Sequence, residues 1–198
     1  METTEKIVES YCRYVKGWFT IPNIKCSGQH EIDILAVDTT SKSSIKRYHI
    51  ECGISISGAH SKLTGKEFSL EKLLDRVQQS PQRRTLGFYI ERKFNLKEVL
   101  SKLGEYGFKN GNYTKIIVTW GWTEEAQKKA KQAHILLWDF REILKNIANS
   151  CQGKKTYYTD DTLRTIQLFQ RSRKENKNDR KKVRSCIRKS ETRCKTNS

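Results

Sequence analysis

The sequence lacks long hydrophobic runs and paired cysteines with zinc spacing. No apolar segment approaches the roughly 20 residues that a membrane-spanning helix needs. The N-terminal Met-Glu-Thr-Thr-Glu is polar and acidic, so we expect no secretory signal peptide. These absences argue against a membrane protein and predict an intracellular, cytoplasmic location.

Cysteine usage points to the same compartment. None of the six cysteines form a C-x-x-C pair, and no Cys/His cluster has the spacing of a zinc site. We therefore expect free thiols in a reducing environment and no structural zinc. The cysteines are Cys12, Cys26, Cys52, Cys151, Cys186 and Cys194.

Acidic residues are too few to balance the basic ones. The chain has 39 Lys and Arg against 22 Asp and Glu, a net charge of +17. This excess predicts a polyanionic partner, most often nucleic acid, with an anionic membrane surface as the alternative.

Residues 171–198 carry a large share of that charge. They hold 12 basic and three acidic residues, or +9, and almost no apolar residues. Such a segment cannot bury a core, so we predict one globular domain at 1–170 and a disordered basic tail. The tail either improves solubility or binds phosphates without sequence preference, with Arg180, Lys181 and Lys182 as candidate contacts.

The periodicity of residues 1–170 predicts an α/β fold. A leading helix, an antiparallel hairpin and then alternating helices and strands indicate a mixed sheet flanked by helices. The predicted helices span 4–17, 96–106, the segment from Thr123 to about 133, 139–148 and 160–170, with a short one near 70–77, and the predicted strands span 20–26, 30–37, 46–56, 85–93, 113–120 and 134–138.

Two predicted strands each contain a carboxylate within an apolar run. These are Asp33 in 30–37 and Glu51 in 48–53. Burying a charge is costly unless it is paired. A hairpin centred on residue 42 puts the two carboxylates directly opposite each other, with Cβ atoms about 5 Å apart. Because a cation would relieve their repulsion, we predict a Mg²⁺ or Mn²⁺ site and phosphodiester chemistry.

The order of these elements resembles the PD-(D/E)xK nuclease superfamily, and most of all its Mrr-like, restriction-endonuclease-like domains. The section 116–126, followed by Ala130 and 135–139, is similar to the C-terminal part of such domains. The resemblance covers about residues 5–145. It implies metal-dependent cleavage of nucleic acid, with Asp33 and Glu51 binding the metal and a Lys two residues after Glu51 activating water.

At that position the chain has Gly53 instead of Lys. In this superfamily the Lys can come from a neighbouring element. Lys93, within Glu91-Arg92-Lys93, is the first candidate, and Lys66 is the second.

Further residues are weaker candidates for the site. Glu31 lies on the same strand face as Asp33 and is an additional candidate ligand. Glu9 matches an acid that some superfamily members place on the first helix. His49 shares the face of Glu51, and we expect it at the surface. For nucleic-acid binding, the candidates are Arg83, Arg84 and Lys128 for phosphates and Trp122 for base stacking.

The sequence leaves several functions open. The first is a Mg²⁺-dependent endonuclease of restriction or repair type that acts on DNA, as a homodimer if both strands are cut. The second is a catalytically inactive nucleic-acid-binding module of the same fold, which Gly53 favours. An RNA-processing nuclease and a basic protein that binds an acidic partner or a membrane are further alternatives.

Overall fold

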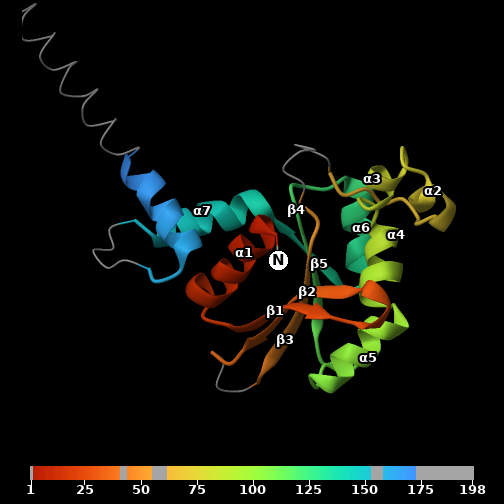
Figure 1. Cartoon of the computed structure of the whole chain (residues 1–198), viewed down its shortest axis with the longest axis horizontal. Helices are drawn as coiled ribbons and strands as arrows, with labels where there is room; N and C mark the ends of the chain where they lie inside the picture. The colour runs from red at the N-terminus through yellow and green to blue at the C-terminus, as the bar shows by residue number, and fades with distance from the viewer. Residues whose placement is uncertain (1, 41–43, 55–61, 153–157, 173–198) are drawn as a thin grey trace, which may run out of the picture. The chain divides into compact units, whose positions relative to one another are not determined.

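The computed structural model describes residues 2–40, 44–54, 62–152 and 158–172 (Figure 1). The chain divides into two compact units, Met1–Asn146 and Ile147–Ser198. In the second unit, residues 161–172 are helical and Leu163 is fully buried. Arg180, Lys181 and Lys182 of the predicted basic tail lie outside the described residues.

The first unit contains a five-stranded mixed sheet in the order β1-β2-β3-β4-β5. The first three strands are antiparallel, and β3, β4 and β5 run parallel to one another. The predicted α/β class with a mixed sheet flanked by helices is therefore confirmed. The strands are β1 (Phe19–Lys25), β2 (Glu31–Asp38), β3 (Lys46–Cys52), β4 (Thr114–Thr119) and β5 (Ile135–Asp139).

The β2–β3 hairpin has the predicted register. Ile34 pairs with Ile50 and Leu35 with His49, so the hairpin is symmetric about residue 42. Side chains alternate between the two faces of a strand. One further step along this register brings Asp33 opposite Glu51.

Helices pack on both sides of the sheet, with α1 on the opposite side from α5 and α6 (Figure 1). α6 approaches the sheet through two buried alanines, Ala126 and Ala130. Its N-terminus is capped as predicted, because the side chain of Thr123 accepts a hydrogen bond from the backbone N–H of Ala126. The helices of this unit are α1 (Thr3–Ser10), α2 (Leu70–Leu74), α3 (Gln79–Gln82), α4 (Leu86–Phe88), α5 (Lys97–Glu105) and α6 (Glu124–Gln132), while α7 (Phe140–Ser150) spans the division between the units.

The predicted strand at 85–93 is wrong, because this segment is helical. The Thr85 side chain accepts from the backbone N–H of Phe88 and starts α4, which continues into a π-helical segment, η3 (Tyr89–Phe94). The apolar run from Leu86 onward resembles a strand in composition. Its buried residues Leu86, Tyr89 and Phe94 recur at three- and five-residue spacing, which fits a helix that widens into a π turn.

Neither membrane helices nor disulfides occur in the part of the chain that the structure describes. No helix there has the length and apolarity needed to cross a bilayer. Cys12, Cys26, Cys52 and Cys151 are all outside disulfides.

Two glycines in helices provide a test of this packing. A Cβ at Gly87 would lie 2.4 Å from the backbone nitrogen of Phe68, whereas a Cβ at Gly104 would meet nothing within 4 Å. We expect Gly87→Ala to lower the free energy of unfolding by about 1–3 kcal/mol because the backbone must move. Gly104→Ala, in α5, should raise it by about 0.5–1 kcal/mol. Urea denaturation of both variants measures this, and equal effects would contradict the packing around α4.

Candidate active site

Asp33 and Glu51 meet at the end of the β2–β3 hairpin. Both are buried, with exposed fractions of 5% for Asp33 and 0% for Glu51. The backbone N–H of Cys52 donates a hydrogen bond of 2.7 Å to Oδ2 of Asp33. The structure therefore holds two carboxylates together below the surface, as the hairpin register requires.

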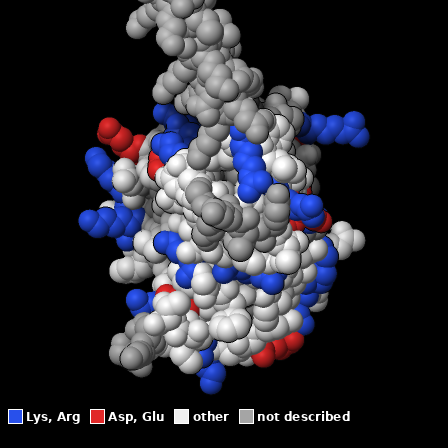
Figure 2. Space-filling model, turned by 90° about the vertical axis from the view of Figure 1, so that its left-hand side faces the viewer, with Lys and Arg blue, Asp and Glu red and all other residues white. Residues whose placement is uncertain are grey.

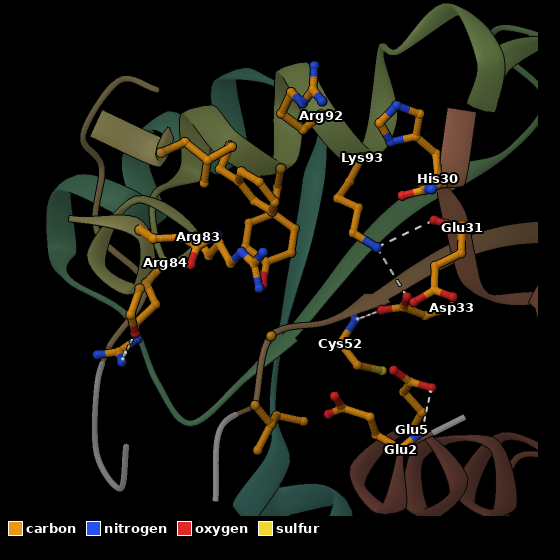
Figure 3. Close-up of a pocket in the computed structure, with 18 of the residues that line it drawn as sticks. Glu2, Glu5, His30, Glu31, Asp33, Cys52, Arg83, Arg84, Arg92 and Lys93 are labelled. Atoms are coloured by element: carbon orange, nitrogen blue, oxygen red, sulfur yellow. Dashed lines mark hydrogen bonds and ion pairs between the residues drawn. The ribbon is translucent and has the colours of Figure 1, made fainter. Parts of the chain in front are cut away.

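Lys93 supplies the opposite charge from η3. Its Nζ lies 3.2 Å from Oδ1 of Asp33 and 2.7 Å from Oε2 of Glu51. It also donates to the backbone carbonyl of Glu31 at 3.4 Å, and Figure 3 shows the side chain extended toward Asp33 and Glu31. The side chain of Lys93 is 22% exposed, so it forms the accessible side of the cluster.

Tyr89 explains why position 53 is glycine. A Cβ on Gly53 would lie 1.8 Å from the hydroxyl oxygen of Tyr89. The buried Tyr89 ring thus occupies the space that a lysine side chain at position 53 would need. Because Tyr89 and Lys93 belong to the same π-helical segment, the element that fills this space also delivers an ammonium group to the carboxylates.

Burial controls the electrostatics of the three groups. It raises the pKa of Asp33 to about 7, with a further increase from Glu51 and an opposing effect of Lys93. Burial likewise raises the pKa of Glu51 to about 7, against the attraction of Lys93. Burial alone would lower the pKa of Lys93, but Glu51 and Asp33 outweigh it and raise that pKa well above its usual value. Lys93 is therefore a permanent cation and cannot act as a base near neutral pH.

His49 lies beneath Glu51, and its predicted surface position is wrong. The side chain is fully buried, and its Nε2 lies 2.7 Å from Oε1 of Glu51. Burial lowers the pKa of His49 to about 3, so the ring is neutral and Nε2–H donates to the carboxylate. Phe94 packs edge-on against the ring, because η3 covers this face of β3.

Of the three remaining site candidates from the sequence, one lines the pocket above this cluster and two do not. Glu31 lines the pocket above it, and its carboxylate is ion-paired with Lys25. Glu9 lies outside the pocket lining, where Thr20 donates to it and Arg13 approaches to 3.7 Å. Lys66 is exposed and also outside the lining.

Sequence reasoning missed the helix-borne acid that does line the pocket. Glu5 lies one turn before Glu9 on α1 and forms a capping box with Glu2. Burial raises the pKa of Glu5, and the nearby charge of Asp33 raises it further. The Glu2-x-x-Glu5 spacing at the start of a predicted helix was the available signal.

A pocket of about 860 Å³ opens above the cluster. Figure 3 shows Glu2 and Glu5 on one side of it and Arg83 and Arg84 on another. Arg92 is also in the lining, so three arginines contribute to the wall of the pocket.

Two residues predicted to contact nucleic acid lie outside the lining of this pocket. Lys128 is exposed on α6, outside the lining. Trp122 is half-buried, packs against the buried cluster around Leu63 and Phe94 and lies outside the pocket lining. Trp120 lines the pocket instead.

The oxygen atoms of Asp33 and Glu51 are the type of ligand that a hard divalent cation prefers. Mg²⁺ is commonly held by one or two carboxylates, with water and phosphate oxygens completing its shell. Oε2 of Glu51 is buried and has no aligned hydrogen bond; its 2.7 Å contact with Lys93 is an ion pair. Within the described residues, no group of three or more His, Cys, Asp or Glu is arranged to hold a metal ion. A cation here would therefore depend on solvent or substrate oxygens for most of its ligands.

Comparisons with known proteins do not assign a family. No protein-family model matches the chain, and no curated protein sequence matches it. One solved structure, titled "Crystal Structure of Protein of Unknown Function AF1548", is similar over 91% of this chain and 96% of that chain, at 15% identity and a TM-score of 0.38. A match this weak carries no argument about function, so the resemblance to the nuclease superfamily stays a prediction.

The raised pKa of Glu51 predicts how stability depends on pH. The folded state binds this proton more tightly than the unfolded chain, so the stabilisation is lost as pH rises through about 7. In EDTA, the free energy of unfolding of the wild type should fall from pH 5 to pH 8. Glu51→Gln cannot titrate at this position, so its free energy of unfolding should fall less than that of the wild type over the same range.

Urea denaturation at several pH values measures the difference. Glu105→Gln, at an exposed position on α5, is the matched control and should follow the wild type. A parallel decline of Glu51→Gln and the wild type would show that Glu51 does not titrate in this range.

Proposed function

We propose that the protein is a metal-dependent endonuclease that hydrolyses phosphodiester bonds in DNA, with Mg²⁺ or Mn²⁺ as cofactor. The observation that carries the proposal is the convergence of Asp33, Glu51 and Lys93, of which Asp33 and Lys93 line one pocket while Glu51 is fully buried in contact with Lys93. Two carboxylates and a lysine from three different elements have no structural need to share a buried site, because a hydrophobic cluster would cost less free energy.

Each of the three groups has a chemical role in this proposal. Asp33 and Glu51 would hold the cation, which polarises a phosphate and lowers the pKa of water when bound. Lys93 is protonated, so its ammonium stabilises the negative charge that develops on the phosphate or on the attacking water. His49 fixes the orientation of Glu51 by donating to Oε1, which leaves Oε2 on the side of Lys93.

The charge of the chain supports a polyanionic substrate. The net charge is +17, and Lys and Arg side chains outnumber acidic ones on the face shown in Figure 2. Arg83 and Arg84 bring basic groups into the pocket itself. Such a distribution favours binding of phosphates and makes affinity depend on salt.

A catalytically inactive DNA-binding module of the same fold is the alternative. The observation in its favour is that the Lys93 ammonium contacts both carboxylates and so satisfies part of their charge without a metal. In that case the cluster would be an ion pair that stabilises the fold, and binding would need no divalent cation.

Cleavage assays distinguish the two functions. We expect the wild type to cut DNA only with Mg²⁺ or Mn²⁺ and to lose this activity in EDTA. Asp33→Asn and Glu51→Gln should reduce the rate to background. Lys93→Met should reduce it by about 100-fold or more, the usual effect of removing one charge-stabilising donor, while Lys93→Arg should retain part of the rate.

Lys102→Met is the matched control for Lys93. Lys102 lies on α5, pairs with Glu105 and is outside the pocket lining, so its loss should leave cleavage unchanged. Circular dichroism shows whether each variant is folded. Absence of cleavage by the wild type on plasmid, single-stranded DNA and RNA, with salt-sensitive binding intact, would favour the inactive module.

A further inference from the structure

The two carboxylates of the proposed site are buried, and this burial constrains the substrate of the proposed nuclease. Glu51 is fully buried and Asp33 is 5% exposed. The pocket above them, about 860 Å³, is within the size range of small-molecule sites. A phosphate must enter this cavity to reach the carboxylates.

Duplex DNA is poorly suited to such an entry. Its persistence length is about 50 nm, so its phosphates are fixed on the surface of a stiff rod. A single strand has unstacked bases and a flexible backbone, and it can be drawn into a groove one nucleotide at a time.

The pocket wall carries the groups that bind single strands. Arg83 and Arg92 line it, and no ion pair within the described residues neutralises either charge. Phe88 and Trp120 add half-buried aromatic surface to the same lining. Nε1 of Trp120 is buried and has no hydrogen-bond acceptor among the described residues. Aromatic and basic groups in one groove are typical of sites for single strands.

The opposite wall disfavours a second backbone. Glu2 and Glu5, at the start of α1, line the pocket across from Arg83 and Arg84 (Figure 3). One strand can follow the arginines, but the phosphates of a paired strand would approach two carboxylates. The two walls therefore have opposite charges, which suits one backbone and opposes two.

From the burial of the carboxylates, the aromatic and arginine lining and the acidic wall, we propose that this pocket takes a single unpaired DNA strand and excludes intact duplex. The inference rests on the proposed function, because it identifies the substrate form of the same site. Cleavage should occur in unpaired segments, including single-stranded tails that extend from a duplex.

The first experiment compares substrates of one sequence with the full-length protein and Mn²⁺. These are a single strand, a duplex closed at both ends by hairpins, and a duplex with a single-stranded tail. We expect the single strand and the tail to be cut at least tenfold faster than the paired region. Equal or faster cleavage of the closed duplex would overturn the inference and leave the proposed function intact.

Binding measured by fluorescence anisotropy in EDTA separates the two proposals. If no substrate is cut, the proposed function fails, and the inference is then judged on binding alone. The inference is supported if the protein binds the single strand more tightly and this preference depends on Trp120 and Arg83. Equal affinity for the single strand and the closed duplex overturns it.

Two matched pairs of variants tie the preference to the pocket. Trp120→Ala should weaken single-strand binding by between about fivefold and a hundredfold, whereas Trp122→Ala, outside the pocket lining, should have no such effect. Arg83→Gln, at an exposed pocket position, should lower the slope of log affinity against log salt by about 0.7, while Lys128→Gln on α6 should leave it unchanged. If both pairs show equal effects, the strand binds elsewhere and the inference is wrong.

Discussion

The arrangement of this site depends on one constraint, the burial of two carboxylates opposite each other in a hairpin. The register of β2 and β3 requires this opposition, and sheet packing removes both groups from water. Like charges at this separation destabilise a sheet unless a cation offsets them. Lys93 supplies one positive charge from outside the sheet, and the raised pKa values of Asp33 and Glu51 show that this charge only partly offsets the cost of burial.

The π-helical segment η3 meets several requirements at once. Phe94 covers His49, Tyr89 fills the space beside Gly53, and Lys93 reaches the carboxylates. An ordinary α-helical turn would rotate these side chains differently, since a π turn places residues five apart on one face. The widened turn therefore links the hydrophobic core to the charged cluster.

The sequence predicted the features of the fold and site that follow from local patterns, and it missed those that depend on tertiary packing. The hairpin and its register were predictable because apolar runs with polar turns fix strand pairing, and the two carboxylates were conspicuous within those runs. Lys93 was predictable as the substitute for the lysine missing at position 53. Its segment was predicted as a strand because Leu86 to Ile90 is apolar and aromatic in composition. His49 was missed because burial of a polar ring depends on η3, whose position is set by tertiary packing. Trp120 lacked a signal for the same reason, because the lining of a pocket is a property of several elements together. Glu5 had only the Glu2-x-x-Glu5 spacing, which marks the start of a helix and not a pocket.

The charge balance of the cluster connects its resting state with the proposed chemistry. With both carboxylates ionised, Asp33, Glu51 and Lys93 sum to one negative charge, which is a modest burden for a buried site. A divalent cation held by the carboxylates would change this sum to one positive charge and keep both of them ionised. A single phosphodiester carries one negative charge, so it would bring the site to neutrality. Lys93 therefore offsets part of the negative charge of the two carboxylates in the protein without a metal, and in the proposed function it would also set the charge that a metal and one phosphate together complete.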